Sequence, residues 1–428
     1  MGLRVARSDN LGNAKAFETW TSNKFHVFFI MYGILKYIED NNEGNYTCYK
    51  TRKFSLDENI KDTVSENSDL DIVPYNNKGT IAEDDNSHVD TVLISEKDIK
   101  NIRRPWFKYF LDGSRHVYKV DDIAIGDKIY PILAGQLIVG CCKREDRDTF
   151  KKEKITSKIV VSLPKLFYTK GGKREDFAKS YCNKMNQWLR DNSVFWREHP
   201  EIQVDKIVFY DVDGSKIDET DTNEYRNSGI AKIQNEMTDQ EQMMVKELCR
   251  EKKLNDENWL IKDGSLQYNP RFSNMDLAQF NAMRSNYSRV VGISKSFNPD
   301  LLRNFQGEKM APIIANLKPF ERTKAYEYVS EHSVGQKFAI WYLRLRKETG
   351  FRENHFSDIV KCETVIIDDS DKISSDDIDS ICANLIQEAY PVCYGKDSRW
   401  ANHLYPVYLT ETFCKSNYLS NNVFLNLF

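Results

Sequence analysis

Residues 106–114 read Trp-Phe-Lys-Tyr-Phe-Leu-Asp-Gly-Ser, and residues 259–265 read Trp-Leu-Ile-Lys-Asp-Gly-Ser. Each stretch is an aromatic and aliphatic run, typical of a buried strand, that leads directly into an aspartate followed by glycine. The glycine lets the backbone turn and lets a ligand approach closely. Because α/β sheets place ligands at the carboxyl ends of their strands, the two stretches predict an α/β fold with Asp112 and Asp263 side by side in the sheet.

Two aspartates at neighbouring strand ends would supply the hard oxygen ligands that divalent cations prefer. The alternative for either site is an ordinary turn, because Asp-Gly is a common turn dipeptide. A third Asp-Gly-Ser begins at Asp213, after the apolar run at 207–210, and is interpreted as a hairpin turn. A single Asp-Gly motif, taken alone, therefore does not distinguish a metal site from a turn.

The surrounding sequence alternates between strand and helix patterns. Further strands are expected at 117–120, 129–139, 159–163, 207–210, 290–294 and 338–345, and helices at 175–196, 229–253 and 376–389. This alternation favours an α/β core in which a mixed sheet is flanked by helices.

The expected helix at 229–253 carries a carboxylate on its apolar face. Glu241 lies four residues from both Met237 and Val245, so the three side chains share one side of the helix. A carboxylate on an apolar face is costly unless it is paired or binds a cation. Glu241 is therefore the third candidate ligand, and the alternative is a partly exposed glutamate at the edge of the apolar stripe. Glu247 is a weaker candidate because its side of the helix is more polar.

The first 100 residues are expected to form two segments outside the main domain. Residues 1–40 should be helical, and their apolar run at 25–37 is either buried within its own domain or covered by a partner. Residues 41–100 are expected to form an acidic insertion, because Asp, Glu, Asn and Ser outnumber aliphatic residues over 41–86. Residues 101–428 would then form the main domain.

The bulk composition narrows the class of protein. The net charge of −3 means that any DNA would have to bind a local basic patch. Nine cysteines without a CxxC pair argue against a disulfide framework or a structural zinc site and favour a cytoplasmic protein. The apolar run Val27–Leu35 is about half the length of a membrane span, so no membrane association is expected.

The order of these motifs resembles that of NurA nucleases. The matching features are Asp112-Gly-Ser after a strand, Met237 and Glu241 on a helix, Leu-Ile-Lys-Asp-Gly-Ser-Leu at 260–266, Val-Val-Gly-Ile-Ser-Lys-Ser at 290–296 and Tyr-Pro-Val-Tyr-Leu at 405–409. The resemblance covers most of residues 106–415 and is strongest at 259–266 and 290–296.

The resemblance implies an RNase H-like fold and metal-dependent hydrolysis of phosphodiester bonds in DNA. It implies that Asp112, Glu241 and Asp263 bind Mn²⁺ or Mg²⁺. It also implies that Lys295 contacts a DNA phosphate and that Tyr405 belongs to the active-site neighbourhood. From the residues alone, Lys295 is equally a solvated lysine at a strand end, and Tyr405 is equally a core aromatic.

One position departs from the family pattern and leaves the number of metal ions open. NurA proteins commonly have a histidine eight residues after this tyrosine, where the present sequence has Phe413. Glu411 or His403 could replace that histidine, or one ligand is missing. The departure keeps open a second hypothesis, namely a catalytically impaired NurA-like subunit that binds DNA or its partner as a scaffold.

The resemblance also implies partners. NurA proteins are dimers that dock on a hexameric HerA-type ATPase, in DNA end processing or in defence against phage, so a homodimer and such an ATPase are expected. Arg103, Arg104 and Arg115 are candidate phosphate contacts near Asp112, although exposed arginines more often only solvate a surface. A glycosidase with two catalytic acids is a further alternative, but it would require exposed tryptophans near the aspartates, and the seven tryptophans do not cluster there.

Overall fold

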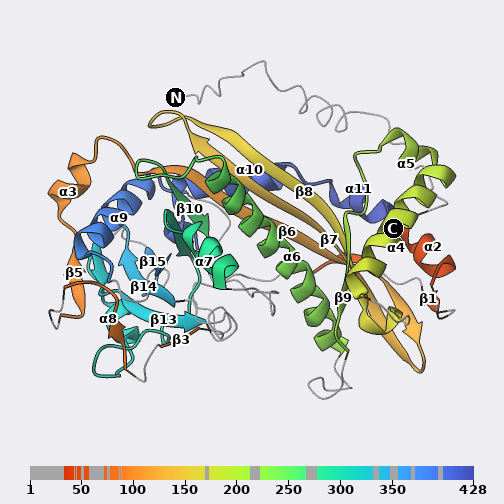
Figure 1. Cartoon of the computed structure of the whole chain (residues 1–428), viewed down its shortest axis with the longest axis horizontal. Helices are drawn as coiled ribbons and strands as arrows, with labels where there is room; N and C mark the ends of the chain where they lie inside the picture. Colours follow the sequence, from red (N-terminus) through yellow and green to blue (C-terminus); the bar gives the residue numbers. More distant parts are fainter. Residues whose placement is uncertain are drawn as a thin grey trace.

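The computed structural model describes residues 33–42, 44, 46–49, 53–56, 72–74, 78–85, 87, 89–168, 173–212, 222–266, 277–330, 337–347, 355–367, 372–393 and 399–428. These residues form a large mixed β-sheet with helices on both faces, so the expected α/β class is confirmed (Figure 1). Asp213 and residues 25–32 lie outside the described residues.

The centre of the sheet is built from three long antiparallel strands and three short strands, each of which runs parallel to its neighbour. In spatial order the strands are β11 (Val290–Ser294), β10 (Trp259–Asp263), β6 (Phe107–Ile125), β7 (Lys128–Arg144), β8 (Phe150–Pro164) and β9 (Lys206–Tyr210). The strand β10 runs parallel to both β6 and β11, whereas β6, β7 and β8 alternate in direction. The motifs that contain the two aspartates are therefore on adjacent strands, as the sequence predicted.

Beyond β11 the sheet continues as an antiparallel unit. Its main strands are β15 (Ile359–Val365), β14 (Lys337–Arg344) and β13 (Tyr326–Ser330), with β12 (Glu321–Thr323) beside β14. The side chains of this unit pack around the buried Trp341, and α9 (Ser375–Glu388) covers one of its faces with Leu385. This unit buries the edge of β11 that would otherwise be open.

Residues 41–100 differ from the predicted solvated insertion in their described parts. These parts form β1 (Thr47–Tyr49), β2 (Phe54–Ser55), β3 (Ile72–Pro74), β4 (Thr80–Ile81), β5 (Thr91–Leu93) and the helix α3 (Glu96–Asn101). Strands β1 and β2 pair with β6, β3 and β4 pair with β13, and β5 pairs with β12. Short edge strands need few aliphatic residues because backbone hydrogen bonds hold them, which explains why composition missed them.

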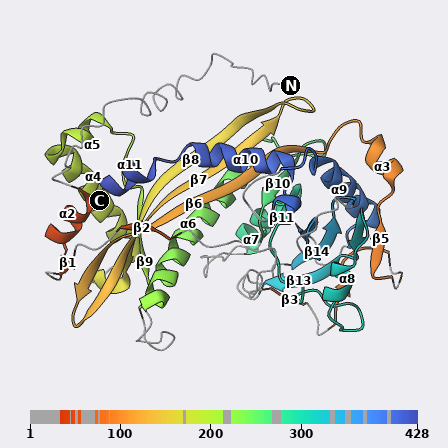
Figure 2. The same ribbon diagram turned by 180° about the vertical axis from the view of Figure 1, so that it is seen from behind.

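Helices cover the two faces of the central strands. The long helix α6 (Thr222–Arg250) lies across one face, and its Ile233 and Val245 pack against Leu111 and Leu137 of the sheet (Figure 1). The other face carries α10 (Tyr405–Ser416) and α11 (Asn421–Asn426), seen in front of the sheet in Figure 2. The smaller helices α4 (Arg174–Asn192), α5 (Val194–Glu198), α7 (Leu277–Ser285) and α8 (Ala311–Ala315) complete the layers.

The expected amino-terminal helix is described only from Gly33 onward. In its described part, α2 (Ile34–Asp40), the side chains of Ile34, Tyr37 and Ile38 are buried against the rest of the chain, and the ring of Tyr37 lies 5.2 Å from that of Tyr181 on α4. This part therefore follows the alternative in which the helix packs in its own domain. Among the described helices, none combines the length and the apolar character that crossing a bilayer requires.

Candidate metal centre

Asp112 lies in the interior of β6 and not at a strand end as predicted. The strand continues to Ile125 because it remains paired with β7 along its whole length. Its other neighbour, β10, pairs with it only as far as Leu111. Asp112 is therefore the first residue of β6 after its last paired position with β10, a place where the sheet opens on one side. The residue is 5% exposed.

Asp263 is the last residue of β10, in agreement with the predicted strand end. The preceding residue, Lys262, is the register partner of Leu111 on β6, so Asp263 lies one step further and next to Asp112. Gly264 follows with a φ of +84°, a left-handed conformation that glycine adopts without strain. The Asp-Gly pair thus ends the strand while its aspartate faces the neighbouring aspartate.

The third carboxylate comes from α10, far along the chain. One carboxylate oxygen from each of Asp112, Asp263 and Glu411 lies within 4.8 Å of the other two. The Glu411 side chain is only 12% exposed. Three hard oxygen ligands at this spacing, from three different elements, could hold a metal ion, and they fit the ligand preference of Mg²⁺ or Mn²⁺. We call these three residues the carboxylate triad.

The helix α10 reaches the triad because it packs very closely on β6 and β7. A β-carbon at Gly140 of β7 would lie 2.5 Å from the Cys414 sulfur, so only glycine allows this approach. The Cys414 thiol lies 3.6 Å from the carbonyl oxygen of Asp112, and the Thr410 hydroxyl donates to the carbonyl of Phe110 at 3.4 Å. These contacts hold Glu411 over the two aspartates.

Lys295 lies inside the site, immediately after β11. Its ammonium nitrogen is 2.8 Å from Asp263 Oδ2 and 3.2 Å from Glu411 Oε2. The side chain is 7% exposed, so the expectation of a solvent-accessible lysine at a strand end is wrong, because α10 covers it. Burial acts to lower the pKa of Lys295, but the surrounding carboxylates outweigh it and raise the pKa.

Two of the triad carboxylates, Asp112 and Glu411, have opposite pKa shifts. Burial, with the negative charges of Asp263, Glu411 and Glu241, raises the pKa of Asp112 well above its ordinary value, and Lys295 only partly opposes this. For Glu411 burial acts in the same direction, but Lys295, Lys415 and His403 outweigh it and lower the pKa to about 2. Glu411 therefore stays ionised, whereas ionising Asp112 beside it costs free energy. A bound cation would lower that cost.

Glu241 is buried on α6 as predicted, but it is not a member of the triad. Its carboxylate forms an ion pair with Lys262, with 2.7 Å between Oε2 and Nζ. Gly113 provides the space, because a β-carbon there would collide with Glu241 Oε1. Burial raises the pKa of Glu241 and Lys262 opposes the rise. The sequence correctly identified Glu241 as a carboxylate that needs a cation, but that cation is Lys262 and not a metal ion. The third carboxylate beside the two aspartates is Glu411.

Two other glutamates of α6, Glu247 and Glu236, are paired away from the triad. Glu247 pairs with Lys154 near the surface, at 3.0 Å. The buried Glu236 pairs with Lys158 at 3.2 Å and with Lys206.

The carboxyl-terminal residues singled out from the sequence lie on α10 or just before it. Tyr405 is half-buried at the start of the helix, and its ring contacts Phe150 in an edge-on arrangement, as a core aromatic would. Phe413 packs beside Gly140 of the sheet. His403 is buried, with Nδ1 3.9 Å from Glu411 Oε2. Of the two residues considered as replacements for the missing histidine, Glu411 is the one that joins the aspartates.

The arginines near Asp112 in sequence do not join the triad. Arg115 bonds to Gln234 of α6, and Arg103 and Arg104 are exposed before β6 begins. Any role for the latter two would be at the protein surface.

The importance of α10 was missed in the sequence, although a signal was present. Pro406 lies in the first turn of the helix, a position that proline favours. Glu411 follows Val407 by four residues and precedes Cys414 by three, and both of these apolar residues are buried. This spacing is the same signal that identified Glu241.

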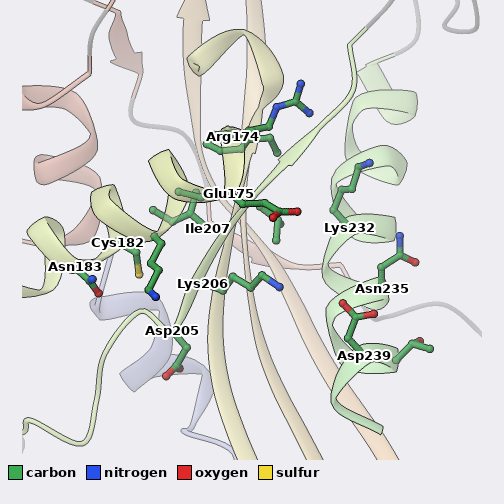
Figure 3. Close-up of a pocket in the computed structure, with 15 residues that line it drawn as sticks. Arg174, Glu175, Cys182, Asn183, Asp205, Lys206, Ile207, Lys232, Asn235 and Asp239 are labelled. Atoms are coloured by element: carbon green, nitrogen blue, oxygen red, sulfur yellow. The ribbon is translucent and has the colours of Figure 1, made fainter. Parts of the chain in front are cut away.

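A groove of about 870 Å³ lies elsewhere on the molecule, between α4, β9 and α6. Figure 3 shows Lys232, Asn235 and Asp239 entering it from α6, opposite Cys182 and Asn183 of α4. No triad residue lines it. Two of its lysines are paired with acids, Lys232 with Asp211 at 3.2 Å and Lys206 with Glu236. The groove is therefore separate from the candidate metal centre.

No protein-family model matches this sequence, and no curated protein matches it either. The function must therefore be argued from the geometry of the site.

Proposed function

We propose that this chain is a metal-dependent deoxyribonuclease of the NurA type that hydrolyses phosphodiester bonds. The observation that carries the proposal is the convergence of Asp112, Asp263 and Glu411 within 4.8 Å of one another at the open side of a sheet. Buried carboxylates are not brought together without a compensating cation, because their mutual repulsion in a region of low dielectric is costly. Mn²⁺ or Mg²⁺ is the cation proposed for this site.

A divalent ion in such a site activates a water molecule and stabilises the charged oxygens of the reacting phosphate. The protein supplies the remaining parts. The triad fixes the position of the ion, and Lys295 adds a positive charge in the same place. A phosphodiester backbone brings a negative charge on every nucleotide, which complements a cationic centre of this kind.

The sheet topology supports an RNase H-like core for this nuclease. Three long antiparallel strands, β6, β7 and β8, come first, and β10 and β11 then add in parallel on the other side of β6. Two carboxylates come from the adjacent strands β6 and β10, and the third from a helix near the carboxyl end of the chain. The three ligands are thus carried by separate elements of one rigid sheet and its covering helix.

The proposed partners rest on the NurA resemblance. They are DNA, a second copy of the chain and a hexameric HerA-type ATPase that would deliver DNA during end processing or phage defence.

Cleavage of end-labelled linear DNA in the presence of Mn²⁺, with and without a HerA-type ATPase, tests the proposal. The wild-type chain should cut, and Asp263→Asn should reduce the rate by more than about 100-fold, because losing a direct ligand should cost at least as much as losing an outer-shell partner. Asp213→Asn changes the third Asp-Gly-Ser of the sequence and is the matched control, with cleavage unchanged. Equal rates for wild type and Asp263→Asn would contradict the proposal.

One observation favours the second candidate, a scaffold subunit without catalysis. The ammonium of Lys295 already engages Asp263 and Glu411, and a metal-free salt-bridge network would have the same arrangement. DNA binding without any Mn²⁺-dependent cleavage, even with the ATPase, would favour this candidate.

The glycosidase alternative gains no support from the tryptophans closest to the aspartates in sequence. Trp106 and Trp259 stack on each other with ring centroids 5.3 Å apart, just before β6 and at the first residue of β10, whereas Asp263 is the last residue of β10.

A further inference from the structure

Two buried lysines accompany the acidic residues of the candidate metal centre. The Lys295 side chain is 7% exposed and the Lys262 side chain is 6% exposed. A buried ammonium is costly to desolvate, so each of these lysines requires a compensating negative charge. Their partners show which carboxylates of the centre each lysine compensates.

Lys262 compensates the charge of Glu241 and keeps that carboxylate out of the triad. Its ammonium lies 2.7 Å from Glu241 Oε2 and also donates to the carbonyl oxygens of Asp263 and Ser265, at 3.0 and 3.2 Å. Three fixed acceptors hold the lysine in place. A second metal ion would need further carboxylate ligands. Glu241 does not serve as one, because it is paired with Lys262. Within the described residues, the group able to hold a metal has three members only.

Lys295 compensates part of the charge of the triad itself. The three carboxylates carry three negative charges when they are ionised, and Lys295 lies against two of them. The positive charge of Lys295 balances one of these three, so two negative charges remain. One divalent ion balances those two. A second divalent ion would leave the same buried site with a surplus of two positive charges, and that surplus is as costly as the acidic repulsion it replaces.

We propose that the site binds a single divalent ion and that Lys295 takes the place of the second ion of a two-metal nuclease. This inference rests on the proposed function and specifies its metal content. In two-metal sites the second ion adds positive charge beside the reacting phosphate, at about 3.5–4 Å from the first. Lys295 brings one fixed positive charge that lies against two of the three carboxylates that would hold the first ion, Asp263 and Glu411.

Manganese binding to the full chain tests this inference without requiring activity. Titration calorimetry should give one Mn²⁺ per wild-type chain, and the bound ion should show the electron paramagnetic resonance spectrum of an isolated, uncoupled Mn²⁺. Lys295→Met keeps the length of the side chain and removes its charge, so the variant should bind a second Mn²⁺, coupled to the first. Lys295→Arg retains the charge and should bind one.

Lys415→Ala is the matched control. Lys415 also pairs with Glu411, at 2.6 Å, but its side chain is 52% exposed and its charge is screened by solvent. This variant should still bind one ion. A Lys295→Met variant that folds and binds a single ion would overturn the inference.

The wild-type spectrum decides the question even if the variants do not fold. Two coupled ions per wild-type chain, together with Mn²⁺-dependent cleavage, would overturn the single-ion inference and leave the nuclease proposal standing. Absence of Mn²⁺ binding to the wild-type chain would overturn both.

Discussion

At the scale of single residues, the site consists of the carboxylates of Asp112, Asp263 and Glu411, with the ammonium of Lys295 against two of them. The sequence predicted the two aspartates as a pair, and it named Glu411 only as a replacement for a missing histidine. Glu241 was chosen because its helix position predicts burial, and it is buried. Helical spacing shows that a buried carboxylate needs a cation, but it does not show which cation. Here the cation is Lys262, which lies on β10 and comes near Glu241 only in the folded sheet.

The raised pKa of Asp112 predicts how metal affinity depends on pH. A carboxylate must be ionised to bind a divalent ion, and below its raised pKa Asp112 is protonated. The affinity for Mn²⁺ should therefore increase as the pH rises through the pKa of Asp112, and binding below that pKa should release about one proton. Calorimetry in two buffers of different ionisation enthalpy measures the proton release. An affinity that does not change with pH above the ordinary pKa of an aspartate would be inconsistent with this assignment.

Glu411 and Glu241 should behave differently when each is changed to glutamine. Glu411→Gln should weaken Mn²⁺ binding by at least about tenfold to 100-fold, because a ligand loses its charge. Glu241→Gln should leave the number of bound ions unchanged but destabilise the fold by about 3–5 kcal/mol, because the buried charge of Lys262 loses its partner. Calorimetry and urea denaturation measure the two effects. Loss of the metal from the Glu241 variant, with the Glu411 variant unaffected, would restore the assignment made from the sequence.

At the scale of secondary structure, the site depends on one strand that ends and one helix that covers it. The strand β10 ends at Asp263 while β6 continues to Ile125, and α10 lies over the resulting opening. The sequence predicted the short strands 259–263 and 290–294 closely, because each is a compact apolar run. It placed Asp112 at a strand end, because the continuation of β6 depends on pairing with β7, which local sequence does not reveal.

Gly140 should control the distance between α10 and the sheet. A β-carbon there would lie 2.5 Å from Cys414 Sγ, so Gly140→Ala should push the helix outward at a cost of about 1–3 kcal/mol. Glu411 would move with the helix, and Mn²⁺ affinity should fall. Combining Gly140→Ala with Cys414→Ala removes the clash, so the double variant should recover part of both losses. Strictly additive losses in the double variant would show that the two residues do not interact.

At the scale of the whole molecule, the triad joins parts of the chain that no local pattern connects. The α/β class followed from the alternation of strands and helices. The described strands between 47 and 93 did not, because their edge positions are held by backbone pairing more than by apolar side chains. The complete sheet determines which helix packs against which strand end. The third ligand, Glu411 of α10, therefore could not be assigned from the sequence in the way that the two aspartates were.

A ligand that binds only the folded chain should stabilise the whole molecule. At a Mn²⁺ concentration about 100 times the dissociation constant, the free energy of unfolding should rise by about 2.7 kcal/mol. Thermal denaturation should show a higher midpoint with Mn²⁺, and a chelator should reverse the change. In Asp263→Asn the midpoint should respond little to Mn²⁺, whereas Asp213→Asn should respond like the wild type. A shift of equal size in all three chains would mean that Mn²⁺ acts elsewhere.

The central claim is that Asp112, Asp263 and Glu411 together bind a divalent ion, and anomalous diffraction tests it most directly. Crystals of the full chain soaked in Mn²⁺ and measured at the manganese absorption edge locate the ion independently of any activity. We predict one strong anomalous peak in contact with a carboxylate oxygen from each of the three residues. A fully soaked crystal with no peak there, or with its only peak at Glu241, would contradict the claim.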